Sequence, residues 1–281
     1  MRSLTTVGLV IAALAVGAWI GLPLLFKTLG LHPDYAGERI AFPGGRALIV
    51  TTSHGALSPG TEATGVFASE MTGPYYVFND AGLHVDVASI AGGAIPIDPL
   101  SFYWFVETHD DKRFKVDAAF RGKVRNALKI DDVDFASYDI VYLAGGWGAA
   151  YDLGQSDVLG RKLTEAWKAG RILGGVCHGP RGLLRTQDET GAPLVRGRRV
   201  TGVSDKQVQE LGITMTPLHP ERELRAAGAR FEGATAFRDI FANHVVSDGR
   251  LITGQNQNAA LEVAATMIAA AKRARERGAL Q

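Results

Sequence analysis

The sequence predicts an α/β domain built as a three-layer sandwich, in which helices cover both faces of a mostly parallel sheet. Short, almost wholly apolar runs alternate with helical segments, which is the pattern of strands buried on both faces. Polar or glycine-rich turns follow three of these runs, at residues 53–55, 145–147 and 177–179. Because the carboxyl ends of parallel strands meet at one edge of a sheet, we expect these turns to converge on a functional site.

The individual elements follow from these runs in chain order. We expect strands at residues 46–53, 83–89, 139–144, 171–176, 199–203, 241–247 and 250–253. We expect helices at residues 61–81, 114–128, 156–169 and 258–275. Gly73-Pro74 interrupts the first helix, and Gly170 ends the third. Asp248-Gly249 is a hairpin signal that joins the last two strands.

An uncharged segment precedes the α/β domain. No residue from Ser3 to Phe26 is charged, and about 20 helical residues are enough to cross the hydrocarbon core of a membrane. We therefore expect an N-terminal transmembrane anchor (or uncleaved signal) at residues 1–27, a linker at 28–45 and one catalytic domain at 46–281.

The alternative to an anchor is a cleaved signal peptide, with its cleavage site near Val16-Gly17-Ala18. The apolar run continues past this site, which favours the anchor. Arg2 on one flank and Lys27 with Arg39 on the other give a weak positive-inside bias. This bias places the catalytic domain on the extracytoplasmic (periplasmic) side.

The charge and cysteine content exclude several classes of function. The formal net charge is +1 and the basic residues are dispersed, so we expect no nucleic-acid partner. The single cysteine permits no intramolecular disulfide and leaves the compartment undecided. The sequence has no zinc-type cysteine pairing and no Walker loop, and we expect neither a metal nor an organic cofactor.

That single cysteine stands in a nucleophile elbow. The spacing Gly175-x-Cys177-x-Gly179 follows an apolar run, and glycines are needed where such a strained turn leaves no room for a Cβ. A helix beginning after Cys177 is expected to direct its positive end at the sulfur and favour the thiolate. The alternative is a buried, inert cysteine on a core strand.

Together with three further motifs, this elbow resembles the ThiJ/PfpI superfamily, which comprises the class I glutamine amidotransferase-like domains. Within this superfamily the resemblance is to the glyoxalase III-like, heat-shock chaperone branch. The resemblance covers about residues 47–270. It is carried by Gly-Val-Phe-Ala-Ser-Glu at 65–70, Ala-Gly-Gly-Trp-Gly-Ala at 144–149, Val-Cys-His-Gly-Pro at 176–180, and Val-Thr-Gly-Val-Ser-Asp at 200–205. It implies a flavodoxin-like fold and a homodimer.

The resemblance also implies roles for individual residues. Cys177 matches the nucleophile, His178 the adjacent histidine, and Glu70 the acid beside the cysteine. Gly145 and Gly146 match the loop whose backbone amides face a developing oxyanion.

Two residues at strand ends are candidates for the pocket wall: His54 and Trp147. The sequence departs from the family where a carboxylate normally orients the histidine, because Val208 stands there. Asp205 and Glu210 are the nearby acids that could substitute for it. A cysteine–glutamate dyad is therefore expected in place of a triad.

These residues lead to one main hypothesis and two alternatives. We expect a glyoxalase III-type lyase that converts methylglyoxal or a related α-ketoaldehyde to a 2-hydroxy acid through a Cys177 hemithioacetal, without glutathione. The same elbow would serve a cysteine amidase or peptidase. A membrane-tethered chaperone that senses oxidants through the Cys177 thiol is the third hypothesis.

Overall fold

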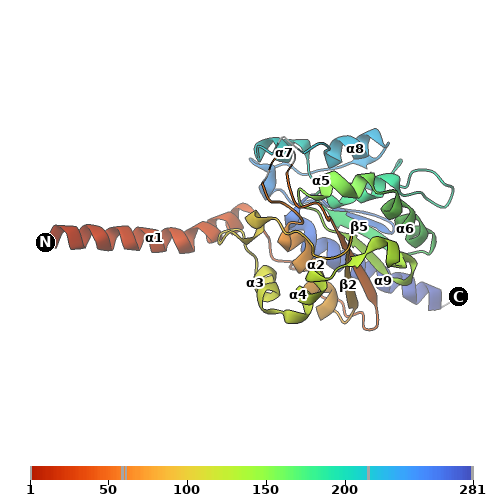
Figure 1. Ribbon diagram of the computed structural model, residues 1–281, viewed down its shortest axis with the longest axis horizontal. Coiled ribbons are helices and arrows are strands. Elements are labelled where there is room, and N and C mark those ends of the chain that lie inside the picture. Colours follow the sequence, from red (N-terminus) through yellow and green to blue (C-terminus); the bar gives the residue numbers. More distant parts are fainter. Residues whose placement is uncertain (1, 58–59, 61, 214–215, 280–281) are drawn as a thin grey trace.

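A seven-stranded sheet forms the centre of the α/β domain (Figure 1). The computed structural model describes residues 2–57, 60, 62–213 and 216–279. The strand order is β3-β2-β1-β4-β5-β9-β8, and all neighbours are parallel except the β8–β9 hairpin. The strands are β1 (Arg46–Thr51), β2 (His84–Ser89), β3 (Leu128–Lys129), β4 (Ile140–Leu143), β5 (Ile172–Val176), β8 (Val245–Asp248) and β9 (Leu251–Gly254). The predicted fold class is confirmed.

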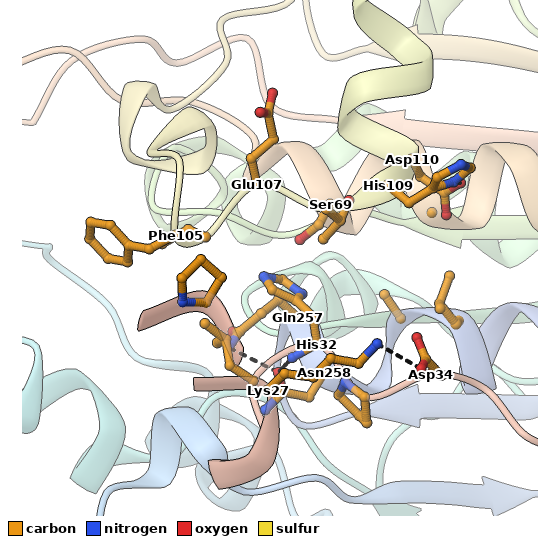
Figure 2. A pocket seen from close by; sticks show the side chains of 18 residues that line it. Lys27, His32, Asp34, Ser69, Phe105, Glu107, His109, Asp110, Gln257 and Asn258 are labelled. Carbon is orange, nitrogen blue, oxygen red and sulfur yellow. Dashed lines mark hydrogen bonds and ion pairs between the residues drawn. The ribbon is translucent and has the colours of Figure 1, made fainter. Parts of the chain in front are cut away.

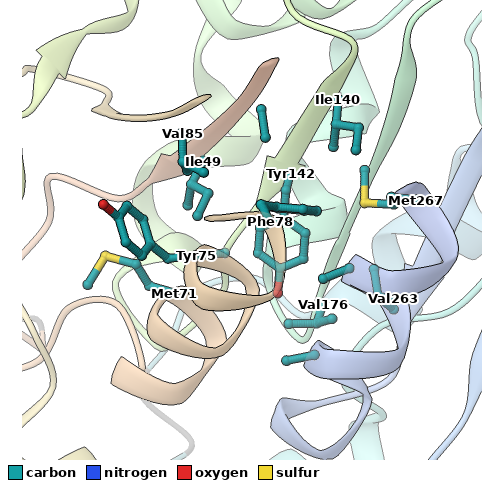
Figure 3. Close-up of a cluster of buried hydrophobic side chains, with 14 of the residues drawn as sticks. Ile49, Met71, Tyr75, Phe78, Val85, Ile140, Tyr142, Val176, Val263 and Met267 are labelled. Carbon is teal, nitrogen blue, oxygen red and sulfur yellow. The ribbon is translucent and has the colours of Figure 1, made fainter. Parts of the chain in front are cut away.

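Helices cover both faces of this sheet and create two hydrophobic cores. Helices α2 (Ala68–Asp80) and α9 (Ala260–Ala279) lie on one face, where Figure 3 shows Phe78 and Met267 packed around Tyr142 of β4. Helix α6 (Asp157–Lys168) lies on the other face. Successive strand residues alternate between the two cores, as period-two geometry requires: Ile49 belongs to the first and Leu48 to the second.

Two of the predicted helices have different bounds. The first begins at Ala68, because the chain before it is extended and Val66 forms an isolated bridge with Ile97. Thr61, where that helix was expected to begin, lies outside the described residues.

The second is two short helices, α3 (His109–Val116) and α4 (Ala118–Arg125). A capping box formed by Thr108 and Asp111 begins α3, and the Asp117 side chain caps α4.

The segment between the elbow and the last two strands also differs from the prediction. The expected strand at residues 199–203 is only β6 (Arg199–Val200), which pairs with β7 (Arg230–Phe231) in a separate two-stranded sheet. The helices α7 (Asp205–Glu210) and α8 (Pro220–Ala226) were not predicted, because each is only two turns or less and has little apolar periodicity. The strand expected at 241–247 is β8, which begins four residues later.

At the N-terminus, helix α1 (Arg2–Leu29) projects away from the domain (Figure 1). Its segment Thr6–Leu29 is long and apolar enough to cross a membrane, and none of its most apolar window is buried by the domain. After α1, residues 30–45 lie against the domain before entering β1. Phe42 is buried and its N–H donates to the carbonyl of Ala81 at the end of α2 (2.7 Å).

A buried arginine ties α8 to the segment that follows the elbow. Arg181 lies in the 3₁₀ segment Gly179–Arg185 and is fully buried. Its guanidinium donates to the carbonyls of Ala149 (3.0 Å) and Ala150 (2.5 Å), and Nε donates to Glu223 of α8 (2.5 Å). These bonds give the buried guanidinium hydrogen-bond acceptors and pair its charge with a carboxylate.

We predict that Arg181→Met lowers the free energy of unfolding by about 3–5 kcal/mol, because it removes the cation bonded to the Glu223 carboxylate and the donors to the carbonyls of Ala149 and Ala150. Chemical denaturation of both proteins measures this. The control is Arg225→Met, which removes an exposed pair with Glu221 and should cost less than about 1 kcal/mol. Equal losses in the two variants would contradict the role assigned to Arg181.

Candidate active site

The turn after β5 holds Cys177 in a strained backbone conformation. Its φ is 60°, in the left-handed region that side chains other than glycine rarely adopt. A Cβ at Gly175 would lie 2.2 Å from the carbonyl oxygen of Leu143, and a Cβ at Gly179 would lie 2.1 Å from it. Both glycines of the motif are therefore required by the close approach of β4, and the elbow geometry is as predicted.

The electrostatics of this turn differ from the prediction. The segment after the elbow is the 3₁₀ run Gly179–Arg185 rather than an α-helix. Only 7% of the Cys177 surface is exposed, and burial raises the pKa of its thiol well above the usual range. The predicted stabilisation of a thiolate by a helix end is therefore not the dominant effect, and a neighbouring proton acceptor is needed.

Glu70 provides that acceptor from the first turn of α2. Its carboxyl hydrogen-bonds the Cys177 thiol, and Oε2 accepts a hydrogen bond from the N–H of Gly145 (3.0 Å). Only 1% of Glu70 is exposed, and burial raises its pKa from 4.5 to about 8 despite these two bonds. A carboxyl in this state keeps its proton at neutral pH and becomes an acceptor for the thiol proton as the pH rises through about 8.

The two glycines after β4 have different partners. The Gly145 N–H is bonded to Glu70, whereas the backbone N–H groups of Gly146 and His178 are directed at the Cys177 sulfur. This differs from the expectation that both glycine amides face an oxyanion. Gly146 has a φ of +96° and leaves no space for a Cβ, which would lie 2.4 Å from the carbonyl oxygen of Gly65.

The histidine of the elbow is neutral and only partly bonded. His178 Nδ1 lies 3.4 Å from Cys177 Sγ, whereas the buried Nε2 has no hydrogen-bond partner among the described residues. Burial lowers the pKa of His178 from 6.5 to about 3, with a further contribution from the Arg181 charge. The ring packs against Trp147, with ring centroids 4.9 Å apart.

The two acids that could have oriented this histidine are bonded elsewhere. Asp205 Oδ1 lies 3.2 Å from Nδ1 of His219, and Glu210 accepts a hydrogen bond from the N–H of Asp239 (2.7 Å). Val208 is fully buried in the core. Within the described part of the chain, no carboxylate is bonded to His178, so the orienting role expected of Asp205 or Glu210 is not found.

The candidate pocket residues lie at the same edge of the sheet. Trp147 is the residue that covers His178, whereas the His54 ring stacks on Tyr151 (centroids 4.1 Å apart) and its Nε2 lies 2.5 Å from the carbonyl of Ala56. His54 is thus held by its own loop. The turn that carries it is fixed by Asp152, which accepts hydrogen bonds from the N–H of Ser53 and the hydroxyl of Thr52.

Sequence reasoning gave no role to Asp152 or to Tyr142. Tyr142 lies in β4 with its hydroxyl buried and without a partner among the described residues, and Glu70 and Cys177 are the charges that raise its pKa after burial. An apolar strand gives no sequence signal for such a group. The tyrosine in residues 139–144 marks only a large core side chain.

A separate cavity of about 250 Å³ lies where the segment after α1 meets the domain (Figure 2). His32, Ser69 and Gln257 are among its lining residues, and Cys177 is not. Ser69 directly precedes Glu70 in α2, but neither Glu70 nor Cys177 lines this cavity.

The chain is similar to several known proteins over most of its length. The chain is 31% identical over 219 residues to glyoxalase 3 of Candida albicans, a match that covers 74% of this chain and 89% of the relative. It is 28% identical to the glutathione-independent glyoxalase HSP31 of Saccharomyces cerevisiae, over 74% of this chain and 90% of that protein.

Solved structures give the same result. The crystal structure of glyoxalase III from Candida albicans matches with a TM-score of 0.73 at 29% identity, over 80% of this chain and 97% of that one. The rapid encystment protein of 24 kDa from Francisella tularensis matches with a TM-score of 0.75 at 31% identity, over 81% and 99%. The model of the DJ-1/PfpI family matches residues 62–270, and the chain belongs to this family.

Proposed function

We propose that this protein is a glutathione-independent glyoxalase, which converts methylglyoxal or a related α-ketoaldehyde to a 2-hydroxy acid. The observation that carries the proposal is the buried pair of Glu70 and Cys177, in which a carboxyl with a pKa of about 8 is bonded to the thiol. Relatives of similar length that bear the name glyoxalase support the substrate class.

The reaction begins with addition of the thiol across the aldehyde. A bond forms between Cys177 Sγ and the aldehyde carbon, and Glu70 takes the thiol proton and delivers it to the aldehyde oxygen. The product is a hemithioacetal. The N–H groups of Gly146 and His178 stabilise negative charge on the sulfur before the attack.

The adduct then isomerises without an external redox agent. The proton on the former aldehyde carbon is removed while the ketone oxygen gains a proton, which gives an enediol. The neighbouring carbon, which was the ketone, is then protonated as the hydroxyl on the first carbon loses its proton. The first carbon is thereby oxidised to a thioester while the second is reduced to an alcohol. Glu70 is the acid–base group for these transfers, and water finally cleaves the thioester to release the 2-hydroxy acid and the thiol.

His178 acts as a neutral hydrogen-bonding group in this scheme. Its pKa of about 3 keeps the ring uncharged, and its unpartnered Nε2 is available to bond a substrate oxygen. The same observation disfavours a cysteine amidase or peptidase, because such enzymes rely on a thiolate–imidazolium pair.

We also propose that α1 anchors the enzyme in a membrane. The support is the length and apolarity of Thr6–Leu29, whose most apolar window is not buried by the domain. The extracytoplasmic position of the catalytic domain stays a prediction from the positive-inside bias. The homodimer stays a prediction from the family resemblance.

We predict that the purified protein converts methylglyoxal to lactate without glutathione, and that Cys177→Ala abolishes the reaction. Enzymatic determination of D- and L-lactate measures the product. Trp147→Phe is the matched control, since it keeps an aromatic ring against His178 and should retain activity within about tenfold. Lactate formation by Cys177→Ala at the wild-type rate would refute the proposed nucleophile.

The raised pKa of Glu70 predicts the pH dependence of the reaction. Loss of one proton from the Glu70–Cys177 pair creates the reactive form, so kcat/KM should rise with pH to a plateau above an apparent pKa of about 8. Glu70→Gln should lower kcat/KM by about 10²–10⁴-fold and remove this limb. An unchanged profile in the variant would assign the limb to another group.

The same pKa predicts how stability changes with pH. The unfolded chain loses the Glu70 proton near 4.5 and the folded protein near 8, so between these values the folded state binds more protons. The free energy of unfolding therefore falls as pH rises through this window, by about 5 kcal/mol from this group. Urea denaturation at several pH values should show a smaller decrease for Glu70→Gln and an unchanged one for the exposed control Glu262→Gln.

A further inference from the structure

One face of α1 packs against aromatic loops of the catalytic domain near the carboxyl edge of the sheet. Phe26 contacts Phe105 and Phe241, with ring centroids 5.6 and 6.0 Å apart. Two turns earlier on the same face, Trp19 stacks on Trp104 at 4.4 Å with an interplanar angle of 9°. The seven-residue spacing of Trp19 and Phe26 places both on one side of the helix.

The junction between α1 and the domain is held by polar contacts as well (Figure 2). The N–H of His32 donates to Asn258 Oδ1 (2.8 Å), and Lys27 pairs with Asp34 (2.7 Å). Leu31, which directly precedes His32, is buried, with 7% of its surface exposed. These contacts fix the position of α1 relative to the domain. The depth at which α1 sits in a membrane therefore determines which part of the domain lies at the membrane surface.

Apolar side chains next to this junction are exposed. We define the aromatic collar as Leu100, Tyr103, Trp104 and Phe237. Leu100 is 42% exposed, Tyr103 50% and Phe237 70%, and Trp104 contacts α1 directly. Phe237 also stacks on Phe241, with ring centroids 5.2 Å apart, and Phe241 in turn contacts Phe26 of α1. The collar is therefore continuous with the helix.

The length of α1 determines where a bilayer would end. Residues 3–21 are uncharged and precede the first half-buried residue of the helix, Leu22. At 1.5 Å per residue these 19 residues span about 28 Å, close to the hydrocarbon thickness of about 30 Å. No spare length separates the membrane from the domain, and Trp19 with its partner Trp104 lies at the level where aromatic side chains favour the interface.

We propose that the aromatic collar inserts into the membrane interface, so that the catalytic domain lies directly on the bilayer. The inference rests on the proposed anchoring by α1 and adds a second membrane contact made by the domain itself. The occupant of this surface is lipid, because the exposed collar is continuous with a helix whose own surface requires an apolar environment.

The connectivity of the sheet gives this docking a direction. Asn258, which bonds the segment after α1, follows the carboxyl end of β9, and Cys177 follows the carboxyl end of its parallel neighbour β5. The collar loop at residues 99–106 likewise comes after β2. The edge of the sheet that carries the catalytic pair is therefore the edge that faces the lipid.

Single-cysteine labelling of the full chain in phosphatidylcholine vesicles tests the proposal. In a Cys177→Ser background, a fluorophore is attached at Tyr103→Cys, at Val10→Cys in α1, or at Glu276→Cys near the end of α9, which lies opposite α1 (Figure 1). Lipids with a nitroxide near the headgroup quench labels at the interface. Quenching at position 103 should exceed that at 276 by more than about threefold.

The three positions separate the possible outcomes. The proposal is supported if a nitroxide deep in the acyl chains quenches the label at Val10→Cys and a nitroxide near the headgroup quenches the label at Tyr103→Cys. Quenching at Val10 without quenching at Tyr103 overturns the collar while the anchor stands. No quenching at Val10 overturns the anchor and the collar together. Circular dichroism shows whether each labelled variant keeps the wild-type fold, and Phe237→Cys repeats the measurement at a second collar position.

Discussion

The hydrogen bond from the Gly145 N–H to the Glu70 carboxyl is the contact on which the rest of the site depends. It joins the end of β4 to the first turn of α2, and it aims the carboxyl at the thiol that β5 presents. A Cβ at Gly145 would lie 2.5 Å from Oε2 and 2.7 Å from the N–H of His178. The end of β4, the first turn of α2 and the elbow after β5 thus approach one another so closely that a side chain at position 145 would clash.

Burial of this contact sets the chemistry that the site can perform. The carboxyl, thiol and imidazole are all most stable uncharged, because burial removes each of them from water. One proton can then move between Glu70, Cys177 and a bound substrate without the site gaining or losing charge. Isomerisation of an α-ketoaldehyde needs only such internal transfers, whereas acyl transfer in a Cys–His enzyme needs a charged imidazole.

Sequence reasoning succeeded where a feature is encoded within a few neighbouring residues. The apolar run around Ile49 predicts β1, and the spacing around Cys177 predicts the elbow. It failed where the outcome depends on contacts between distant segments. The bond between Gly145 and Glu70 joins positions 75 residues apart, and the pairing of β6 with β7 involves strands of two residues each. Neither the occupied Gly145 amide nor the unpartnered His178 Nε2 has a local signature.

The segment after α1 shows how the chain connects the membrane end of the molecule to the sheet. His32 is bonded beside the carboxyl end of β9, and Phe42 is bonded to the end of α2. Only four residues after Phe42 the chain enters β1 at Arg46, whose N–H donates to Asp139 (2.8 Å). The segment therefore crosses the α2–α9 face from the carboxyl edge to the amino edge. Because this segment is hydrogen-bonded at both ends, it holds the domain in a fixed position relative to α1. The position of this one helix then determines which edge of the sheet faces a bilayer.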